Sequence, residues 1–196
     1  MLRGMVAIFA VVGAVVAAGV FGPQPHPLGV RSDHLGPDSG ESTAEYQTRA
    51  RDSLSTNDTR PHWALVSFST ESTLPQAVSV TTGGRIAQLL FRVPIPEQEP
   101  PILTVSVSAH PDAVIDSVRR SAAQALWTEY ITPAATESAN QLYRQNQACR
   151  CLIALVIRAD PTRLRTIAGT PGIQAVQALP TDATAGHFGV TPLFQR

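Results

Sequence analysis

The chain has 196 residues and a formal net charge of zero, because 15 basic residues balance 15 acidic ones. This length is typical of a single domain, and the balanced charge gives no electrostatic footprint for nucleic acid or an anionic membrane surface. All of the basic residues are arginine. The absence of lysine excludes Schiff-base chemistry and the lysine-dependent phosphate sites of P-loop proteins and kinases.

The N-terminal segment is strongly apolar. From Met5 to Phe21 only two glycines interrupt the apolar residues, and no Asp, Glu or Arg occurs between Gly4 and Val30. A helix of these 17 residues would be about 26 Å long, just short of the ~30 Å hydrocarbon core of a bilayer. We therefore expect a single-pass transmembrane signal anchor over residues 1–22, with the rest of the chain outside the cytoplasm. Cleavage of this segment as a signal peptide stays open.

Residues 23–61 have a different composition. Pro, Gly, Ser, Thr and Asp dominate this segment, and aliphatic residues are few. Such a segment buries too little apolar surface to offset the entropy of ordering it. We expect a disordered linker. A short helix over Glu45–Leu54 would be compatible with it.

The folded domain is expected over residues 62–180, followed by a C-terminal tail over residues 181–196. Stretches rich in β-branched and aromatic residues predict its strands. One stretch alternates apolar with polar residues, as a half-buried antiparallel strand does, and another is apolar on both faces, as a central strand is. The expected strands lie in "HWALVSFS" (62–69), "RIAQLLFRVPI" (85–95), the alternating "ILTVSVSA" (102–109), the apolar "CRCLIALVIRADP" (149–161) and "IQAVQALP" (173–180).

Apolar residues at helical spacing predict four helices between these strands. The first ends at Gly83-Gly84 and the last at Gly169, while Pro111 and Pro133 fit first turns of the other two. The helical stretches are "TESTLPQAVSVTT" (70–82), "HPDAVIDSVRRSAAQALW" (110–127), "PAATESANQLYRQNQ" (133–147) and "PTRLRTIAGTPG" (161–172).

The order of these elements repeats. Residues 62–94 and residues 149–180 each run strand, helix, glycine-containing turn and strand, which is the pattern of a β-α-β unit. Two such units sharing one sheet, with their helices on one face, predict an α+β ferredoxin-like sandwich. Residues 102–148 would then be an inserted strand and helical arm. Trp63 and Trp127 are expected in the core or at its edge.

Cys149 and Cys151 are the only cysteines of the chain. On a strand their side chains would point to the same face, at a separation near the upper limit for a disulfide, so a bridge would need a bend at Arg150. Two thiolates alone do not complete a zinc site. We expect free structural thiols at the start of a strand. A disulfide, which suits an oxidising compartment, and a catalytic pair are the alternatives.

The histidines form no recognisable constellation. No two have the spacing of metal ligands, and no serine lies in a Gly-x-Ser-x-Gly context. The sequence therefore assigns no catalytic, metal-binding or cofactor-binding residue, and we expect a protein that is not an enzyme. The five histidines are His26 and His34 in the expected linker, His62 and His110 beside strand ends, and His187 in the tail.

Three further groups of polar residues have structural interpretations. Asp112 and Asp116 fit the first turns of a helix, where the macrodipole favours acidic side chains. Gly83-Gly84-Arg85 lacks the length of a phosphate-binding loop and predicts a helix C-cap instead. Arg119-Arg120 predicts a solvated helix face, with a partner-binding patch as the alternative.

Residues 164–180, "LRTIAGTPGIQAVQALP", resemble the end of protease propeptide and inhibitor domains. In those domains a helix leads through a Pro-Gly turn into a strand, and sheet and tail dock on a protease. The matching residues are Leu164, Pro171, Gly172, Ile173 and Val176. With its N-terminal anchor, its arginine-only basicity and the "CRC" strand, the whole chain resembles uncharacterised membrane-anchored envelope proteins of high-GC Gram-positive bacteria. That second resemblance implies a location and no activity.

These observations predict a membrane-anchored, extracytoplasmic protein-interaction domain without catalytic activity, cofactor or nucleic-acid partner. Its partner would be another envelope protein. The tail would pair with the partner as an added strand if its apolar residues Phe188, Val190, Leu193 and Phe194 are exposed. The alternatives are a protease-inhibitor or propeptide-like module, a small-ligand sensor, and an enzyme with a pocket formed by His62, His110 and Asp112.

Overall fold

A computed structural model describes residues 33–92, 102–107 and 149–193, together with five isolated residues between 124 and 140. The chain divides into two compact units, Met1–Arg31 and Ser32–Arg196, and every described residue belongs to the second. The anchor expected over residues 1–22 lies outside the described residues, as do almost all residues of the expected helices 110–127 and 133–147. Within the described ranges no helix is long and apolar enough to cross a membrane.

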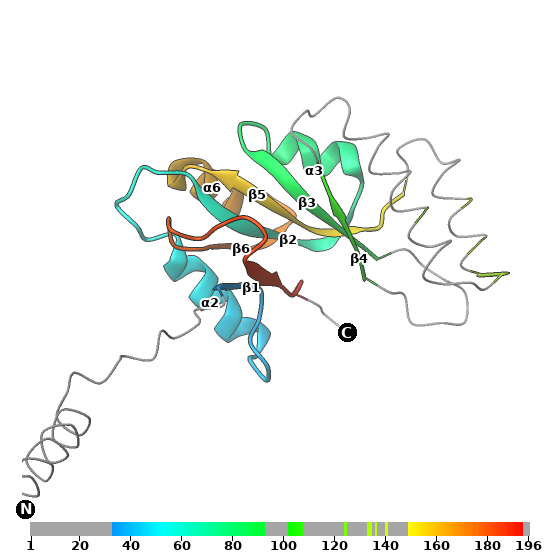
Figure 1. The fold of residues 1–196 in the computed structure, drawn as a ribbon, viewed down its shortest axis with the longest axis horizontal. Helices are drawn as coiled ribbons and strands as arrows, with labels where there is room; N and C mark the ends of the chain where they lie inside the picture. Colours follow the sequence, from blue (N-terminus) through cyan, green and yellow to red (C-terminus); the bar gives the residue numbers. More distant parts are fainter. Residues whose placement is uncertain are drawn as a thin grey trace, which may run out of the picture. The chain divides into compact units, whose positions relative to one another are not determined.

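The centre of the fold is a five-stranded sheet with the order β4-β3-β5-β2-β6 (Figure 1). Every pair of neighbouring strands is antiparallel. An antiparallel sheet with helices confirms the expected α+β class. The strands are β2 (His62–Ser72), β3 (Arg85–Arg92), β4 (Ile102–Ser106), β5 (Leu152–Ala159) and β6 (Ile173–Ala178).

The two units expected from the sequence interleave in this sheet. Helix α3 (Leu74–Val80) connects β2 to β3, which run parallel with β5 between them. Helix α6 (Pro161–Ala168) connects β5 to β6, which run parallel with β2 between them. Each unit therefore supplies the strand that separates the two strands of the other, and β4 extends the sheet beside β3.

Local sequence explains where these helices begin. Thr73 caps α3 in a capping box with Gln76, because each side chain bonds to the backbone N–H of the other residue. Asp160 caps α6 by accepting a hydrogen bond from the N–H of Arg163 at 2.9 Å. A proline in the first turn assists both helices. The C-cap of α3 is Thr81, two residues before the expected Gly83-Gly84, and Gly83, with φ +89°, then turns the chain into β3.

The sheet is buried on both faces. Helices α3 and α6 cover one face, where a large apolar cluster joins them to all five strands of the sheet. The second face carries a smaller cluster that contains Trp63, as expected, and the opposite side chains of β5. From Leu152 to Ile157 every residue of β5 is buried, which confirms the central strand predicted from its two apolar faces.

Segments from both ends of the folded unit cover the second face. They are β1 (Asp33–Leu35), α2 (Thr43–Ser53) and β7 (Phe188–Val190), and β1 pairs with β7 in parallel. The disordered linker expected over residues 23–61 is therefore wrong for residues 33–54. The few apolar residues of this segment recur every four positions at Tyr46, Ala50 and Leu54, so they form one buried helical stripe that the mean composition hides.

A buried glutamine joins β1 to the main sheet. Gln177 of β6 is 5% exposed, and its Oε1 accepts a hydrogen bond from the N–H of Gly36 at 2.6 Å. Its Nε2 donates to the carbonyl oxygen of His34 at 3.1 Å. The N–H of Thr191 donates to the carbonyl of Leu35 at 2.8 Å. The tail therefore packs back against β1, which leaves no room for a side chain at Gly36: a Cβ there would lie 1.7 Å from the carbonyl oxygen of Thr191.

Substitution Gly36→Ala should destabilise the protein by about 3 kcal/mol or more, since positive φ and a backbone clash act together. The matched control is Gly40→Ala. Gly40 also has positive φ, but nothing lies within 4 Å of its added Cβ, so a cost of about 1 kcal/mol is expected. Urea denaturation of both variants measures the difference. Equal losses of stability would show that the contact between Gly36 and Thr191 does not hold the tail.

An ion pair fixes the turn between β1 and α2. The guanidinium of Arg49 donates to Glu41 at 2.8 and 2.6 Å and to the carbonyl oxygen of Gly36 at 2.9 Å. The hydrogen bond with Arg49 is the main cause that lowers the pKa of Glu41 from 4.5 to about 2. Because the folded-state pKa is depressed, the stabilisation from this carboxylate is present above about pH 4.5 and is lost as the pH falls toward 2.

An NMR titration of the side-chain carboxyl groups should find Glu41 with a pKa of about 2. In Arg49→Met the pKa of Glu41 should rise toward 4.5, because its strongest hydrogen bond is removed. Arg51→Met is the control on the same helix, since among the described residues Arg51 bonds to Gln47 and Thr48 and should leave the pKa of Glu41 low. A pKa near 4.5 for Glu41 in the unmodified protein would contradict the ion pair.

Candidate functional site

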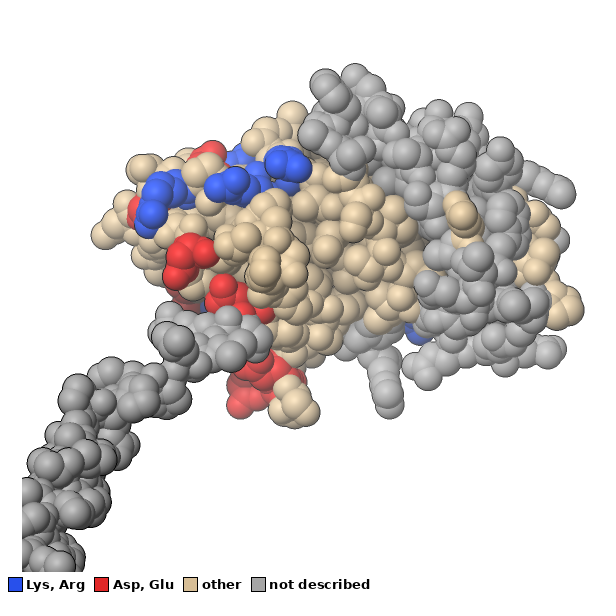
Figure 2. Space-filling model, viewed as in Figure 1, with Lys and Arg blue, Asp and Glu red and all other residues tan. Residues whose placement is uncertain are grey.

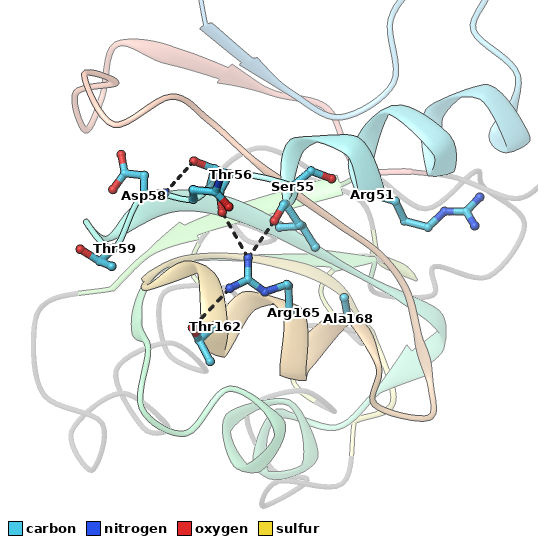
Figure 3. A pocket seen from close by; sticks show the side chains of 10 residues that line it. Arg51, Ser55, Thr56, Asp58, Thr59, Thr162, Arg165 and Ala168 are labelled. Atoms are coloured by element: carbon cyan, nitrogen blue, oxygen red, sulfur yellow. Dashed lines mark hydrogen bonds between the residues drawn. The ribbon is translucent and has the colours of Figure 1, made fainter.

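A groove of about 630 Å³ lies between α6 and the segment that connects α2 to β2 (Figure 3). We call it the α2–α6 groove. Its walls carry two arginines, four hydroxyl groups, one amide and one carboxylate, so eight of its ten lining residues offer hydrogen-bonding groups. The lining residues are Arg51, Leu54, Ser55, Thr56, Asn57, Asp58, Thr59, Thr162, Arg165 and Ala168.

Arg165 holds the two walls of the groove together. Its Nη1 donates to the carbonyl oxygen of Leu54 at 3.0 Å and to that of Thr56 at 3.5 Å, and its Nη2 donates to Oγ1 of Thr162 at 3.3 Å (Figure 3). Leu54 is buried against the helix-covered face of the sheet and anchors the start of the connecting segment. The planar guanidinium suits this role because it presents five N–H donors in a fixed fork.

The connecting segment is also bonded to itself. The N–H of Asp58 donates to Oγ1 of Thr56 at 3.2 Å, and the N–H of Arg60 donates to Oδ1 of Asp58 at 2.5 Å. Oδ2 of Asp58 accepts from the guanidinium of Arg60 at 3.1 Å. The backbone hydrogen bond from Arg60, followed by its side chain, lowers the pKa of Asp58. The groove therefore carries a fixed negative charge at Asp58 and the guanidinium groups of Arg51 and Arg165.

Arginine side chains gather on one part of the surface. Figure 2 shows them at the end of the unit where Figure 1 draws α6, while acidic side chains lie nearer α2. Since the chain has no lysine, all of these cations are guanidinium groups. A guanidinium binds carboxylates through two parallel hydrogen bonds, so this end of the unit suits a carboxylate-bearing ligand.

His62 lies beside the groove, at the start of β2. It is 5% exposed, and its Nδ1 lies 2.6 Å from the carbonyl oxygen of Leu179, which can only accept, so Nδ1 carries the proton. Its Nε2 has no hydrogen-bond partner and lies 4.0 Å from Oδ2 of Asp58. The sequence placed His62 at a strand end but gave no sign of this half-buried carboxylate neighbour, since the pair depends on how the connecting segment folds.

The cysteines are joined. Cys149 and Cys151 form a disulfide with a Cα–Cα distance of 5.4 Å, so the expectation of free thiols is wrong. The reason is local: β5 begins only at Leu152, and residues 149–151 are not part of the strand. The chain therefore bends around Arg150, which brings the two Cα atoms within the range that a disulfide requires.

The other candidate residues do not come together at one place. His34 lies in β1, where its Nε2 is 3.0 Å from Oγ1 of Thr191, and His187 lies exposed in the turn before β7. Trp63 packs 5.9 Å from Phe188 on the second face of the sheet. Several candidates lie outside the described residues, namely His26, His110, Asp112, Asp116, Arg119, Arg120, Trp127 and Phe194. Within the described ranges no three His, Cys, Asp or Glu residues are grouped as metal ligands.

Comparisons of the chain with protein-family models, with curated proteins and with solved structures find no match. The geometry of the site therefore carries the functional argument.

Substitution Arg165→Met should loosen the groove, because the carbonyl oxygens of Leu54 and Thr56 lose their shared donor. We expect a loss of about 1 kcal/mol of stability and faster hydrogen exchange of the amides of Asp58 and Arg60. Arg51→Met is the control, since Arg51 lines the same groove but bonds only within α2. Unchanged exchange at both amides in Arg165→Met would show that Arg165 does not hold the segment.

Proposed function

We propose that the folded unit is a protein-interaction domain of the cell envelope, and that the α2–α6 groove binds an extended, carboxylate-bearing segment of another envelope protein. The lining of the groove carries this proposal. Its hydroxyl groups and the Asn57 amide can pair with the N–H and C=O groups of an extended chain. The guanidinium of Arg51, on the wall formed by α2, suits a carboxylate of that chain.

The architecture and the location are parts of the same proposal. The interleaving of the two β-α-β units supports a ferredoxin-like sandwich, with β4 as the inserted strand. The apolar sequence of residues 5–21 supports a single-pass anchor that places the folded unit outside the cytoplasm. A disulfide between Cys149 and Cys151 agrees with an oxidising compartment.

The groove replaces the tail as the proposed contact. The sequence suggested that the tail adds a strand to the partner if its apolar residues are exposed. Val190 is instead paired with Leu35, and Leu193 is 7% exposed in a cluster with Tyr46 and Ala50. A partner would have to displace these contacts before it could use the tail as a strand.

A protease-inhibitor or propeptide-like module is the alternative function. Residues 164–180 run from α6 through a turn at Pro171-Gly172, where Gly172 has φ +88°, into β6. This helix, turn and strand are what the resemblance to such domains implies. In those domains the tail also docks on the protease, whereas the tail here packs against β1.

Site-specific photo-crosslinking in the native membrane tests the groove. A photoreactive residue at Thr59, in the groove wall, should capture one partner protein, and the same residue at the exposed position Ala185, in the tail, should not. Charge reversal by Arg51→Glu should reduce the yield from position 59 at least tenfold, because a partner carboxylate would then face a carboxylate.

A synthetic peptide scan completes this test. Extended peptides with the acidic residues of the captured partner should bind the full-length protein, and their Glu→Gln versions should bind more weakly. Capture at both positions with equal yield, or binding that Arg51→Glu leaves unchanged, would refute the groove as the contact. A protease as the captured partner would favour the inhibitor-like alternative.

A further inference from the structure

The disulfide between Cys149 and Cys151 encloses a single residue, Arg150. Closing so short a loop removes little conformational entropy from the unfolded chain, so this bridge does not staple distant parts of the fold. It lies instead at the entrance to the central strand β5, which is already held by hydrogen bonds on both sides. A purely structural purpose therefore explains the bridge poorly.

The two sulfur-bearing residues have unequal environments. Cys151 is 1% exposed, and its carbonyl oxygen accepts a hydrogen bond from the N–H of Arg92 at 2.7 Å, so the sheet fixes it. Cys149 is half-buried at the outer edge of the helix-covered core. An incoming thiolate can therefore reach the sulfur of Cys149 more readily than that of Cys151.

A recess adjoins the bridge. It has a volume of about 320 Å³ and includes Arg150 in its lining, together with Glu71 and Ser72 of β2 and Gln76 of α3. Ser72 pairs with Leu152, the residue that follows Cys151, so the recess and the disulfide share one end of the sheet. Arg150 is exposed, lies between the two cysteines in the sequence and lines the recess, and a nearby cation stabilises a thiolate.

We propose that Cys149 and Cys151 are a thiol–disulfide exchange site that oxidises a dithiol of a cysteine-containing polypeptide held at this recess. A substrate thiolate attacks Sγ of Cys149, the S–S bond breaks, and Cys151 leaves with the electron pair as a thiolate, which takes up the proton that the substrate thiol released. The second substrate thiolate then attacks the substrate sulfur of the mixed disulfide and releases Cys149. The substrate becomes a disulfide, and the protein disulfide becomes two thiols, which a small-molecule disulfide reoxidises. This activity goes beyond the binding function proposed for the α2–α6 groove.

The test uses the purified full-length protein and a fluorescent peptide with two reduced cysteines. One peptide disulfide should form for each protein disulfide consumed, and mass-tagging of thiols should show two new thiols per protein. Far-UV circular dichroism should stay unchanged on reduction, because the three-residue loop contributes little to the fold. A disulfide that the peptide reduces only in denaturant, or a fold that is lost on reduction, would overturn the proposal.

Single-cysteine variants separate the two sulfurs. With a peptide activated as a mixed disulfide, Cys151→Ser should form an adduct at Cys149 at least tenfold faster than Cys149→Ser forms one at Cys151. Arg150→Gln should slow the reaction of Cys149 severalfold, whereas Arg158→Gln, on the other end of β5, should not. Equal rates for the two cysteines, or equal effects of the two arginine variants, would refute the assigned roles.

Discussion

The burial of β5 on both faces is the constraint on which this structure depends. Leu155 and Ile157 face the helix-covered cluster, while Ala154 and Val156 face the opposite one. A strand with two apolar faces needs two covering layers, because either face left in water would forfeit its hydrophobic stabilisation. The crossover helices α3 and α6 provide the first layer. The second comes from outside the two β-α-β units, from β1, α2 and β7.

That second layer determines where the candidate site lies. Once α2 packs beside β6, the chain must travel from the end of α2 to the start of β2 past α6, and the α2–α6 groove lies along this path. Arg165 bonds to the carbonyl oxygen of Leu54 across 111 residues of sequence. The groove is thus a consequence of how the N-terminal segment closes the core, and a change that released α2 would remove it.

Three arginine side chains bond a helix to a turn or to the end of another helix. Arg49 donates to the carbonyl oxygen of Gly36, Arg163 to that of Val80 and Arg165 to that of Leu54. In each case a guanidinium donates to a backbone acceptor at a turn or a helix end, and Arg49 and Arg165 direct further donors to Glu41 and Thr162. A compact ammonium group lacks this planar fork, so the arginine-only composition has a structural use here.

Local sequence patterns were enough to predict the strands of the two β-α-β units, the central position of β5, and the helices that Thr73 and Asp160 cap. Periodicity and capping act over a few residues, so a linear pattern reveals them. The other features depend on contacts between segments that are distant in the sequence. The packing of residues 33–54 depends on a sheet face that needed a cover, and the disulfide depends on a bend before β5. The groove joins residues more than a hundred positions apart, and no local sequence signal predicts such a contact.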